Sequence, residues 1–276
     1  MWAVVLPAKD EAARIGPLLQ QVLRLPVGLI IPVINGSNDM TEGIVGRVED
    51  PRVRSLYFAE PLGYDVPRIV GALYARQRGA RAVLFVDADL TGKLDGLLIR
   101  LAQAVTEDKL DLALTDCYAE TPVPFRESAA KRVYEGRVAL NEALGRPDLG
   151  PAIPSHGPVA ISRRLLQELD PALLGVPPLC QAVAVKRGLR VGVAGRLPHR
   201  ALGSAPRPVE HQLKIAETIL GDCRAGTNWA KNGRPDREGH DGYHSERRFD
   251  LTGYEAPERA LATPVKKSTI KVGWPT

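Results

Sequence analysis

Short apolar runs alternate with amphipathic stretches over residues 1–115 of the chain. The apolar runs predict strands at residues 3–6, 29–34, 53–58, 82–86 and 110–114. The stretches between them predict helices at about residues 11–23, 41–48, 66–78 and 94–105. Because this alternation is typical of βαβ units, we expect an α/β fold with a mostly parallel, Rossmann-like sheet flanked by helices.

The pattern becomes less regular after about residue 120. Elements are expected at residues 127–144 (helix), 159–169 (a strand turning into a helix capped by Ser162), 179–187 (helix), 190–194 (strand) and 209–220 (helix). Residues 145–158 are a Pro/Gly-rich connection. We expect one domain over residues 1–223, with halves at 1–115 and 116–223. Residues 224–276 show no sustained period, which predicts an extended C-terminal arm packed on its own or a neighbouring subunit, or disorder.

Composition limits the class of protein. The 276 residues can bury a sizeable core, and they contain no run of roughly 18 apolar residues that would span a membrane. The opening "MWAVVLPAKDE" lacks a basic n-region and a cleavage site, so we expect a cytoplasmic protein. The net charge is +5, but basic residues are spread along the chain and aromatics are only 5%. This favours a phosphate-rich small substrate over nucleic acid, and the long arm suggests a homodimer.

The strongest chemical signal lies in "ARAVLFVDADL", residues 80–90. Its apolar run predicts a buried central strand that stops at Asp87, Ala88 and Asp89. Ligands of open α/β sheets bind outside the carboxyl ends of the strands, and Mg²⁺ is held by one or two carboxylates plus nucleotide phosphates. The segment therefore predicts a site for a metal-chelated nucleoside diphosphate, the alternative being a solvated turn.

Three motifs then resemble one family. The segments "VVLPAKDEAARIGPLL", "INGSNDMT" and "VLFVDADL" occur in the order found in the donor half of family 2-type glycosyltransferases, which have the GT-A fold; the resemblance covers residues 2–115. Downstream, "YEGRVALNEAL", "SHGPVAISRRLL" and "GRLPHRAL" are similar to segments of the glucosyl-3-phosphoglycerate synthases. Those retaining enzymes move glucose from a nucleoside diphosphate to a phosphorylated three-carbon acid.

The resemblance implies a donor and metal site. Asp89 would contact Mg²⁺ or Mn²⁺ directly, and Asp87, with Ala88 beside it, would contact the ribose or metal-bound water; both carboxylates would serve catalysis. His199 would complete the metal site, the alternative being a surface histidine. The first nucleotide loop would hold the base and ribose with Pro7, Ala8 and Glu11.

The second loop departs from the family pattern. Its paired Asp is replaced by Ile34 and Asn35, which leaves Asn35, Ser37 and Asp39 as the polar nucleotide-binding residues. Asn35 can still donate and accept hydrogen bonds, so we expect uridine as the first choice of base and guanosine as the second. Ser37 and Asp39 have the alternative role of capping the helix that starts near residue 41.

The diphosphate and the acceptor would be bound by arginines. Arg68 stands where the synthases carry a Lys, and its guanidinium would grip the diphosphate, the alternative being a surface helix residue. Gly136 and the catalytic Arg137 would bind the acceptor phosphate, and His156 would line the acceptor pocket.

A further departure concerns residues 177–179, Pro-Pro-Leu, where inverting family members place a catalytic carboxylate. Without that base, retention is favoured, because the departing phosphate oxygen can accept the acceptor's proton. Two other functions stay open. A sugar nucleotidyltransferase would need a glycine-rich loop that "LPAKDEAARIG" lacks, and a non-catalytic nucleotide-sugar-binding protein would account for the missing carboxylates.

Overall fold

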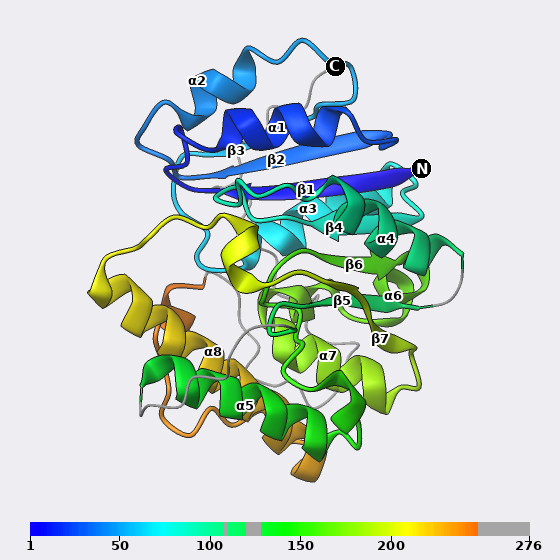
Figure 1. The fold of residues 1–276 in the computed structure, drawn as a ribbon, viewed down its shortest axis with the longest axis vertical. Helices are drawn as coiled ribbons and strands as arrows, with labels where there is room; N and C mark the ends of the chain where they lie inside the picture. The colour runs from blue at the N-terminus through cyan, green and yellow to red at the C-terminus, as the bar shows by residue number, and fades with distance from the viewer. Residues whose placement is uncertain (108–109, 120–127, 248–276) are drawn as a thin grey trace.

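The computed structural model describes residues 1–107, 110–119 and 128–247. They form a seven-stranded sheet in the order β3-β2-β1-β4-β6-β5-β7 (Figure 1). The strands are β1 (Trp2–Ala8), β2 (Leu29–Asn35), β3 (Leu56–Phe58), β4 (Ala82–Phe85), β5 (Leu112–Asp116), β6 (Val159–Ser162) and β7 (Val191–Arg196). Only β6 runs antiparallel to its neighbours, β4 and β5, among these strands. The predicted mostly parallel α/β sheet is confirmed.

Helices follow most strands, as the alternating pattern predicts. The α-helices are α1 (Ile15–Leu23), α2 (Thr41–Gly46), α3 (Val66–Gln77), α4 (Asp95–Thr106), α5 (Ala129–Ala143), α6 (Arg163–Glu168), α7 (Pro177–Lys186) and α8 (Val209–Asn232). Short 3₁₀ turns are η1 (Pro147–Leu149), η2 (Pro171–Gly175), η3 (His199–Leu202) and η4 (His244–Glu246). Ser162 caps α6 as expected, since its hydroxyl accepts a hydrogen bond from the Leu165 amide at 3.1 Å.

Both faces of the sheet are buried. Successive side chains of a strand point to opposite faces. In β1, Val4 and Leu6 pack in the core shared with α1 and α4, whereas Ala3 and Val5 pack in the core shared with α3 and α7. This two-sided burial explains why the central strands read as continuous apolar runs rather than as alternating ones.

A third layer, α5 and α8, packs against α7 on the side away from β1 and β2 (Figure 1). Leu140 and Leu220 lie in the small core between these helices. Gly226 permits the close approach, because a Cβ there would lie 3.0 Å from Leu140 Cδ1 and from the Pro178 carbonyl oxygen. The layer formed by α5 and α8 is therefore joined to the sheet through α7.

Helix α1 begins four residues later than predicted, at Ile15 rather than at residue 11. The preceding residues are bonded to the loop after β2 instead of continuing the helix. The Glu11 amide donates to Thr41 Oγ1 at 2.8 Å, and the Ala12 amide donates to Asp39 Oδ2 at 3.0 Å. These bonds hold the first loop in the non-helical shape that the site uses.

Helix α8 is longer than predicted. It runs to Asn232 rather than ending near residue 220, so the boundary expected between residues 223 and 224 lies inside a helix. Its buried residues there include Gly221, Cys223, Ala225 and Gly226, which are small and give no apolar stripe in the sequence. The rest of the expected arm, residues 233–247, packs on the body of the molecule, and residues 248–276 lie outside the described residues.

Two further features of the fold concern membrane insertion and the cysteines. In the described part of the chain, no helix is both long and apolar enough to cross a bilayer. Cys180 and Cys223 are buried thiols, and burial raises the pKa of each to about 12. Both thiols therefore stay protonated and inert at neutral pH.

Candidate functional site

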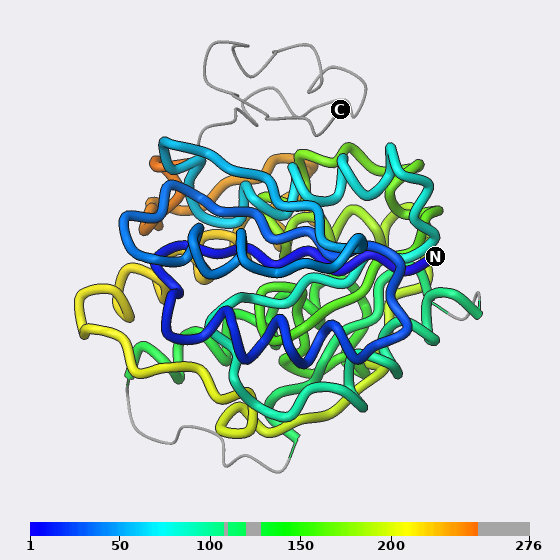
Figure 2. The backbone as a smooth tube through the Cα atoms, turned by 90° about the horizontal axis from the view of Figure 1, so that it is seen from above, coloured from blue at the N-terminus to red at the C-terminus, as the bar shows by residue number. Residues whose placement is uncertain are grey.

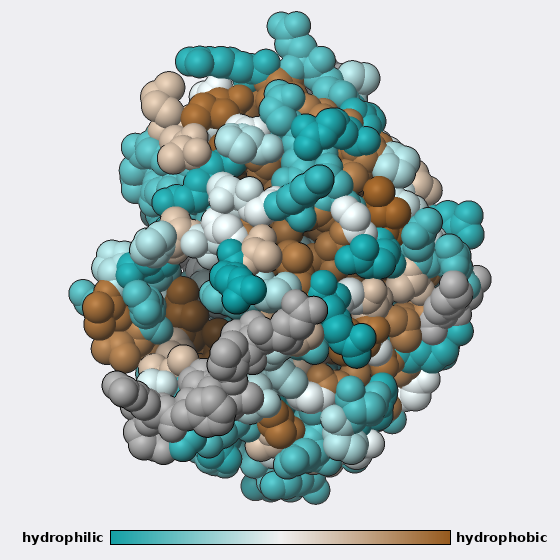
Figure 3. Space-filling model, viewed as in Figure 1, coloured by the Kyte–Doolittle hydropathy of each residue, from teal (hydrophilic) through white to brown (hydrophobic). Residues whose placement is uncertain are grey.

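Three loops meet where β1, β2 and β4 end. The Ala88 amide donates to the Pro7 carbonyl oxygen at 3.1 Å, which ties the loop after β4 to the end of β1. Ala8 and Ala88 are both buried at this junction. Figure 3 shows the surface hollowed beside this edge of the sheet, on the left of the view. The arrangement is the one expected for a ligand site of an open α/β sheet.

The polar residues after β2 shape the first loop. The Asp10 amide donates to Ser37 Oγ at 3.0 Å, and Asp39 accepts from the Ala12 amide. Asp39 also accepts from the Thr41 amide at 2.9 Å, at the start of α2. Ser37 and Asp39 therefore lie at the predicted edge, where their oxygens hold backbone amides.

Asn35 is buried and bridges to the loop that follows β3. Its Oδ1 accepts from the Leu62 amide at 2.7 Å, and its Nδ2 donates to the Gly63 carbonyl oxygen at 3.4 Å. Both ends of the amide are engaged within the protein. Asn35 thus fixes the position of residues 62–63, just ahead of α3.

Arg68, near the start of α3, holds Asp87. Its Nη2 donates to both carboxylate oxygens of Asp87, at 2.9 and 3.2 Å. Its Nε pairs with Asp65 Oδ1 at 3.1 Å, and its Nη1 donates to the Pro154 carbonyl oxygen at 3.2 Å. The side chain is 6% exposed, whereas that of Asp87 is 40% exposed. All three guanidinium nitrogens are therefore engaged, and in this structure Arg68 orients Asp87 rather than facing a diphosphate.

Asp89 is paired with an arginine from a distant loop. Arg207 Nη2 donates to Asp89 Oδ2 at 3.2 Å and to Glu11 Oε1. Arg14 Nη1 holds the other oxygen of Glu11 at 2.6 Å. Burial raises the pKa of Asp89, as do Asp87 and Glu11, and Arg207 opposes this rise. Asp89 and Glu11 thus form a pair of carboxylates that Arg207 bridges.

The second group of site residues surrounds Arg137, on α5. Its Nη1 donates to the Tyr118 hydroxyl at 3.2 Å and to His156 Nδ1 at 2.8 Å. His156 Nε2 lies 3.0 Å from His199 Nδ1. The sequence-predicted Arg137, His156 and His199 are thus brought together in one line, although they come from three separate segments.

The proton positions in this line follow from Arg137, which can only donate. His156 must accept at Nδ1, so a neutral ring carries its proton on Nε2 and donates to His199. Burial, Arg137 and His199 hold the pKa of His156 well below its usual range, and burial and Arg137 lower the pKa of His199. His199 accepts at Nδ1 and therefore carries its own proton on Nε2. To ligate a metal, it has to lose that proton or turn away from His156.

Arg137 is 3% exposed, and its described hydrogen-bond partners are neutral. Within the residues that the structure describes, its Nε and the Ser155 hydroxyl are buried without a hydrogen-bond partner. A buried cation in this state favours an anionic ligand.

Gly136 faces the other way. A Cβ at this position would lie 3.1 Å from Leu220 Cδ2 on α8. The glycine that was expected beside the acceptor phosphate instead lets α5 pack against α8.

In the ranges 1–107, 110–119 and 128–247, no cluster of three or more His, Cys, Asp or Glu side chains has the arrangement of a metal site. Asp89 and His199 are therefore not joined in such a cluster. Their loops are nevertheless bonded: the Gly92 amide donates to the Leu202 carbonyl oxygen at 2.9 Å, and Thr91 Oγ1 donates to the Gly203 carbonyl oxygen at 2.8 Å.

The model of glycosyl transferase family 2 matches residues 3–170. The chain belongs to this family. The match covers all the donor loops together with Arg137 and His156, so the enzyme is a glycosyltransferase. No curated protein matches the chain.

Solved structures share its fold. Glucosyl-3-phosphoglycerate synthase from Mycobacterium tuberculosis, in complex with Mn²⁺, UDP and glucosyl-3-phosphoglycerate, is 22% identical over 86% of this chain and 81% of that chain, with a TM-score of 0.63. The same synthase with Mn²⁺, UDP-glucose and glycerol 3-phosphate is 20% identical over the same shares, with a TM-score of 0.62. A mycobacterial protein is 23% identical over 86% of this chain and 76% of that chain, with a TM-score of 0.61. These likenesses confirm the GT-A fold.

Two site residues of the glycosyltransferase were not predicted. Arg207 comes from a Pro/Gly-rich loop with no motif, and only its contact with Asp89 reveals it. Tyr118 follows β5, and its ring packs edge-on against Tyr134 with centroids 5.0 Å apart. A polar aromatic directly after a buried strand is the signal that could have identified it.

Proposed function

We propose that this glycosyltransferase is a metal-dependent hexosyltransferase. It moves a hexose from a nucleoside-diphosphate sugar, UDP-sugars first, to a small phosphorylated acceptor, with retention of the anomeric configuration. The observation that carries the proposal is the pair of carboxylates after β4: Asp87 and Asp89 at the carboxyl edge of the sheet, each bound by an arginine. The alternative base is guanine.

The residues present fit a hard divalent cation. Asp87 and Asp89 offer only oxygen donors, which Mg²⁺ and Mn²⁺ prefer, and Asp87 is partly exposed. Sites of this kind take one or two carboxylates and complete the coordination with phosphates and water, so a cluster of three protein ligands is not required. When bound, the cation would offset the negative charge that develops on the leaving diphosphate. His199 stays a proposed ligand, which requires that it lose its Nε2 proton or turn away from His156, as described above.

The nucleoside-diphosphate sugar would bind among the three loops around Asp87. Pro7 and Ala8 end β1, and Glu11 lies in the loop that follows. Ser37 and Asp39 hold that loop, whereas Asn35 holds residues 62–63. The synthase with the same fold is crystallised with UDP and with UDP-glucose, which supports uridine as the base.

Arg137 is the proposed anchor of the acceptor. Its buried guanidinium has neutral described partners, and Ser155 Oγ is buried without one. A phosphate would offset this charge and accept hydrogen bonds from both groups. The similar synthase structures hold phosphoglyceric acid and glycerol 3-phosphate, both small phosphorylated molecules. His156 keeps Arg137 in place by accepting from its Nη1.

The proposal of retention rests on the residues at the start of α7. Pro177, Pro178 and Leu179 are buried there and supply no carboxylate to act as a base. In the proposed step, the acceptor hydroxyl oxygen bonds to the anomeric carbon while the bond from that carbon to the diphosphate oxygen breaks. The hydroxyl proton passes to the departing phosphate oxygen on the same face, so the protein has only to hold the two substrates.

A donor and acceptor screen tests the proposal. UDP-, GDP- and ADP-glucose are each incubated with Mn²⁺ and with glycerol 3-phosphate, 3-phosphoglycerate or the matched non-phosphorylated glycerol and glycerate. We expect nucleotide release that requires the metal, a UDP-sugar and a phosphorylated acceptor, and a product whose anomeric coupling in NMR matches that of the donor. Equal turnover of glycerol and glycerol 3-phosphate would contradict the acceptor proposal. The homodimer and the cytoplasmic location stay predictions; sedimentation velocity tests the first.

A further inference from the structure

The last described segment, residues 233–247, lies against the loop that precedes α3. Figure 2 shows this orange segment beside the blue and cyan chain of the first half. The Tyr243 ring stacks on that of Tyr64, with centroids 5.6 Å apart and planes 13° apart. Gly63 has φ +100°, and a Cβ there would lie 2.6 Å from Arg247 Cα. Only a glycine lets the segment approach this closely.

Arg247 extends from this segment into the interior. Its side chain is 1% exposed, and its two terminal nitrogens bond the two oxygens of Asp222 at 2.9 and 2.7 Å. Nη2 also contacts Asp65 Oδ2 at 3.3 Å, and Nε donates to the Tyr64 carbonyl oxygen at 3.1 Å. Arg247 therefore connects α8 to Asp65, the residue just before α3.

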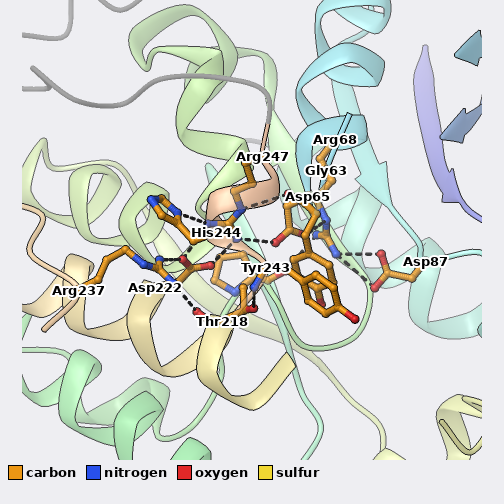
Figure 4. Close-up of polar contacts among 12 residues, drawn as sticks. Gly63, Asp65, Arg68, Asp87, Thr218, Asp222, Arg237, Tyr243, His244 and Arg247 are labelled. Atoms are coloured by element: carbon orange, nitrogen blue, oxygen red, sulfur yellow. Dashed lines mark hydrogen bonds and ion pairs between the residues drawn. The ribbon is translucent and has the colours of Figure 1, made fainter. Parts of the chain in front are cut away.

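Asp65 links Arg247 to the donor site. One of its oxygens bonds Arg247, and the other bonds Arg68, which in turn holds both oxygens of Asp87. With Arg237 on the far side of Asp222, six charged side chains alternate in sign from Arg237 to Asp87 (Figure 4). The three carboxylates and three guanidiniums balance, so removing one interior member leaves an unpaired buried charge.

The orientation of the Asp65 carboxylate depends on Arg247. The backbone of Asp65 is in the left-handed region, at φ +62°, and its carboxylate makes no capping bond to α3. Its described partners are Arg68, three residues further on, which pairs with one oxygen, and Arg247, which contacts the other oxygen from the opposite side. Arg68 Nε in turn relies on Asp65 for its orientation.

We propose that Arg247 is a positioning residue of the donor site, which sets the orientation of the Asp87 carboxylate through Asp65 and Arg68. The inference rests on the proposed function, because it takes Asp87 as part of the nucleotide-sugar site. It assigns to the segment after α8 a part in donor binding, although that segment follows the family match by more than 60 residues.

The test measures the Kd of UDP by calorimetry in the presence of Mn²⁺, for the full-length protein and for Arg247→Met. Loss of partners that orient binding groups costs about ten- to hundredfold in affinity or activity. We expect the Kd of UDP to rise at least about tenfold by this measure, with the KM of the phosphorylated acceptor changed less than about threefold.

Arg237→Met is the matched control. Arg237 also bonds Asp222, and its side chain is 12% exposed, but it lies on the far side of that carboxylate from Asp65. A purely structural role would lower the thermal stability of both variants and leave the Kd of UDP alike in the two. The positioning role predicts a raised Kd in Arg247→Met only. Equal Kd values for the two folded variants would overturn it.

A third variant covers the case in which Arg247→Met does not fold. Arg247→Met with Asp222→Asn removes one charge of each sign and leaves the remaining four balanced, yet still breaks the contact with Asp65. Its Kd must also rise, and an unchanged value overturns the inference. Wild-type protein that binds no UDP would instead contradict the proposed function, so the two failures are distinguishable.

Discussion

The proposed donor and acceptor regions differ in how their charged side chains are paired. Around the donor edge, three carboxylates are each bound by an arginine from another segment: Asp87 by Arg68, and Asp89 and Glu11 by Arg207. Around the acceptor, Arg137 is buried against a phenol and an imidazole. In the first region the carboxylates are already paired with arginines, whereas in the second the described partners of the Arg137 guanidinium are neutral.

This difference indicates what each region binds. Under the proposed function, the donor carboxylates already hold arginines, so a metal-chelated diphosphate would have to compete with Arg207 for Asp89. At the proposed acceptor site, an anion would offset the charge of Arg137. The comparison therefore predicts that metal and phosphate requirements separate cleanly between the two regions, and the following experiments test that separation in order of decreasing effect.

Asp89→Asn should give the largest effect. The amide keeps the size of the side chain but removes the negative charge that would hold the cation. We expect kcat/KM to fall by at least about a hundredfold, the scale of a lost electrostatic contact to the reacting groups, and Mn²⁺ should no longer improve UDP binding in calorimetry. Metal-dependent binding that survives in a folded Asp89→Asn variant would remove this residue from the donor site.

Arg137→Met should act on the acceptor alone. A charge-assisted hydrogen bond contributes about 1.5–3 kcal/mol, which corresponds to about a ten- to hundredfold rise in the KM of glycerol 3-phosphate. The KM of UDP-glucose should stay nearly constant in steady-state assays. Arg132→Met, on the same helix with a side chain that is 52% exposed, is the matched control and should change neither constant. Parallel changes in both substrates would break the proposed division.

We expect the pH dependence of donor binding to follow the ionisation of the Asp65 carboxyl group. Burial raises its pKa to about 6, Arg68 and Arg247 oppose this, and Asp222 and Asp87 add to it. Below this pH the carboxyl takes up a proton and loses its hold on Arg68, so affinity falls as pH decreases and recovers as pH rises. Between pH 7 and pH 5 the ionised fraction falls about tenfold, which sets the upper limit of the effect.

UDP-glucose is the suitable ligand for that measurement, since its diphosphate does not titrate in this range. In Arg247→Met, the loss of a neighbouring cation should shift the midpoint to higher pH. Asp89 has no described contact with Arg247, so an unshifted midpoint in that variant would assign the titration to another group.

Arg207→Met should give the smallest effect. Arg207 is partly exposed, and such ion pairs contribute about 0.2–1 kcal/mol, which predicts at most about fivefold tighter binding of Mn²⁺ to the nucleotide-free protein. Paramagnetic titration of Mn²⁺ measures this directly. Arg14→Met also removes a partner of Glu11 but leaves Asp89 untouched, so it should not change the affinity. Weaker Mn²⁺ binding in Arg207→Met would show that the two cations do not compete.

The fold was largely predictable, because burial on both faces of the sheet produces apolar runs that the sequence displays openly. Predictions were wrong where packing does not depend on such runs. Strand β3 begins at Leu56 rather than at residue 53, with only an isolated bridge at Val53. The second half of α8 packs through small residues such as Gly226, which carry no periodic signal.

The candidate site was more predictable in the residues it contains than in their contacts. Strand ends and family motifs mark Asp87, Asp89 and Arg137, whose roles stay predictions, whereas nothing in the sequence marks the pairings around them. Arg68 and Asp65 are three residues apart, yet their partners Asp87 and Arg247 come from segments 19 and 182 residues away. Pairing between such distant charges depends on the finished fold, and a single sequence gives no sign of it.

The reversed strand β6 has a consequence for how acceptor preference can diverge. Because β6 runs against its neighbours, the chain arrives at the catalytic rim before this strand, whereas it arrives there after β1, β2 and β4. The residues leading into β6, including Ser155 and His156, therefore approach this rim from the direction opposite to that of the donor loops, but they are tied to them: the Pro154 carbonyl oxygen accepts a hydrogen bond from Arg68 at 3.2 Å. Under the proposed function, insertions and deletions in this entry segment can alter the acceptor side only where they leave that carbonyl in place.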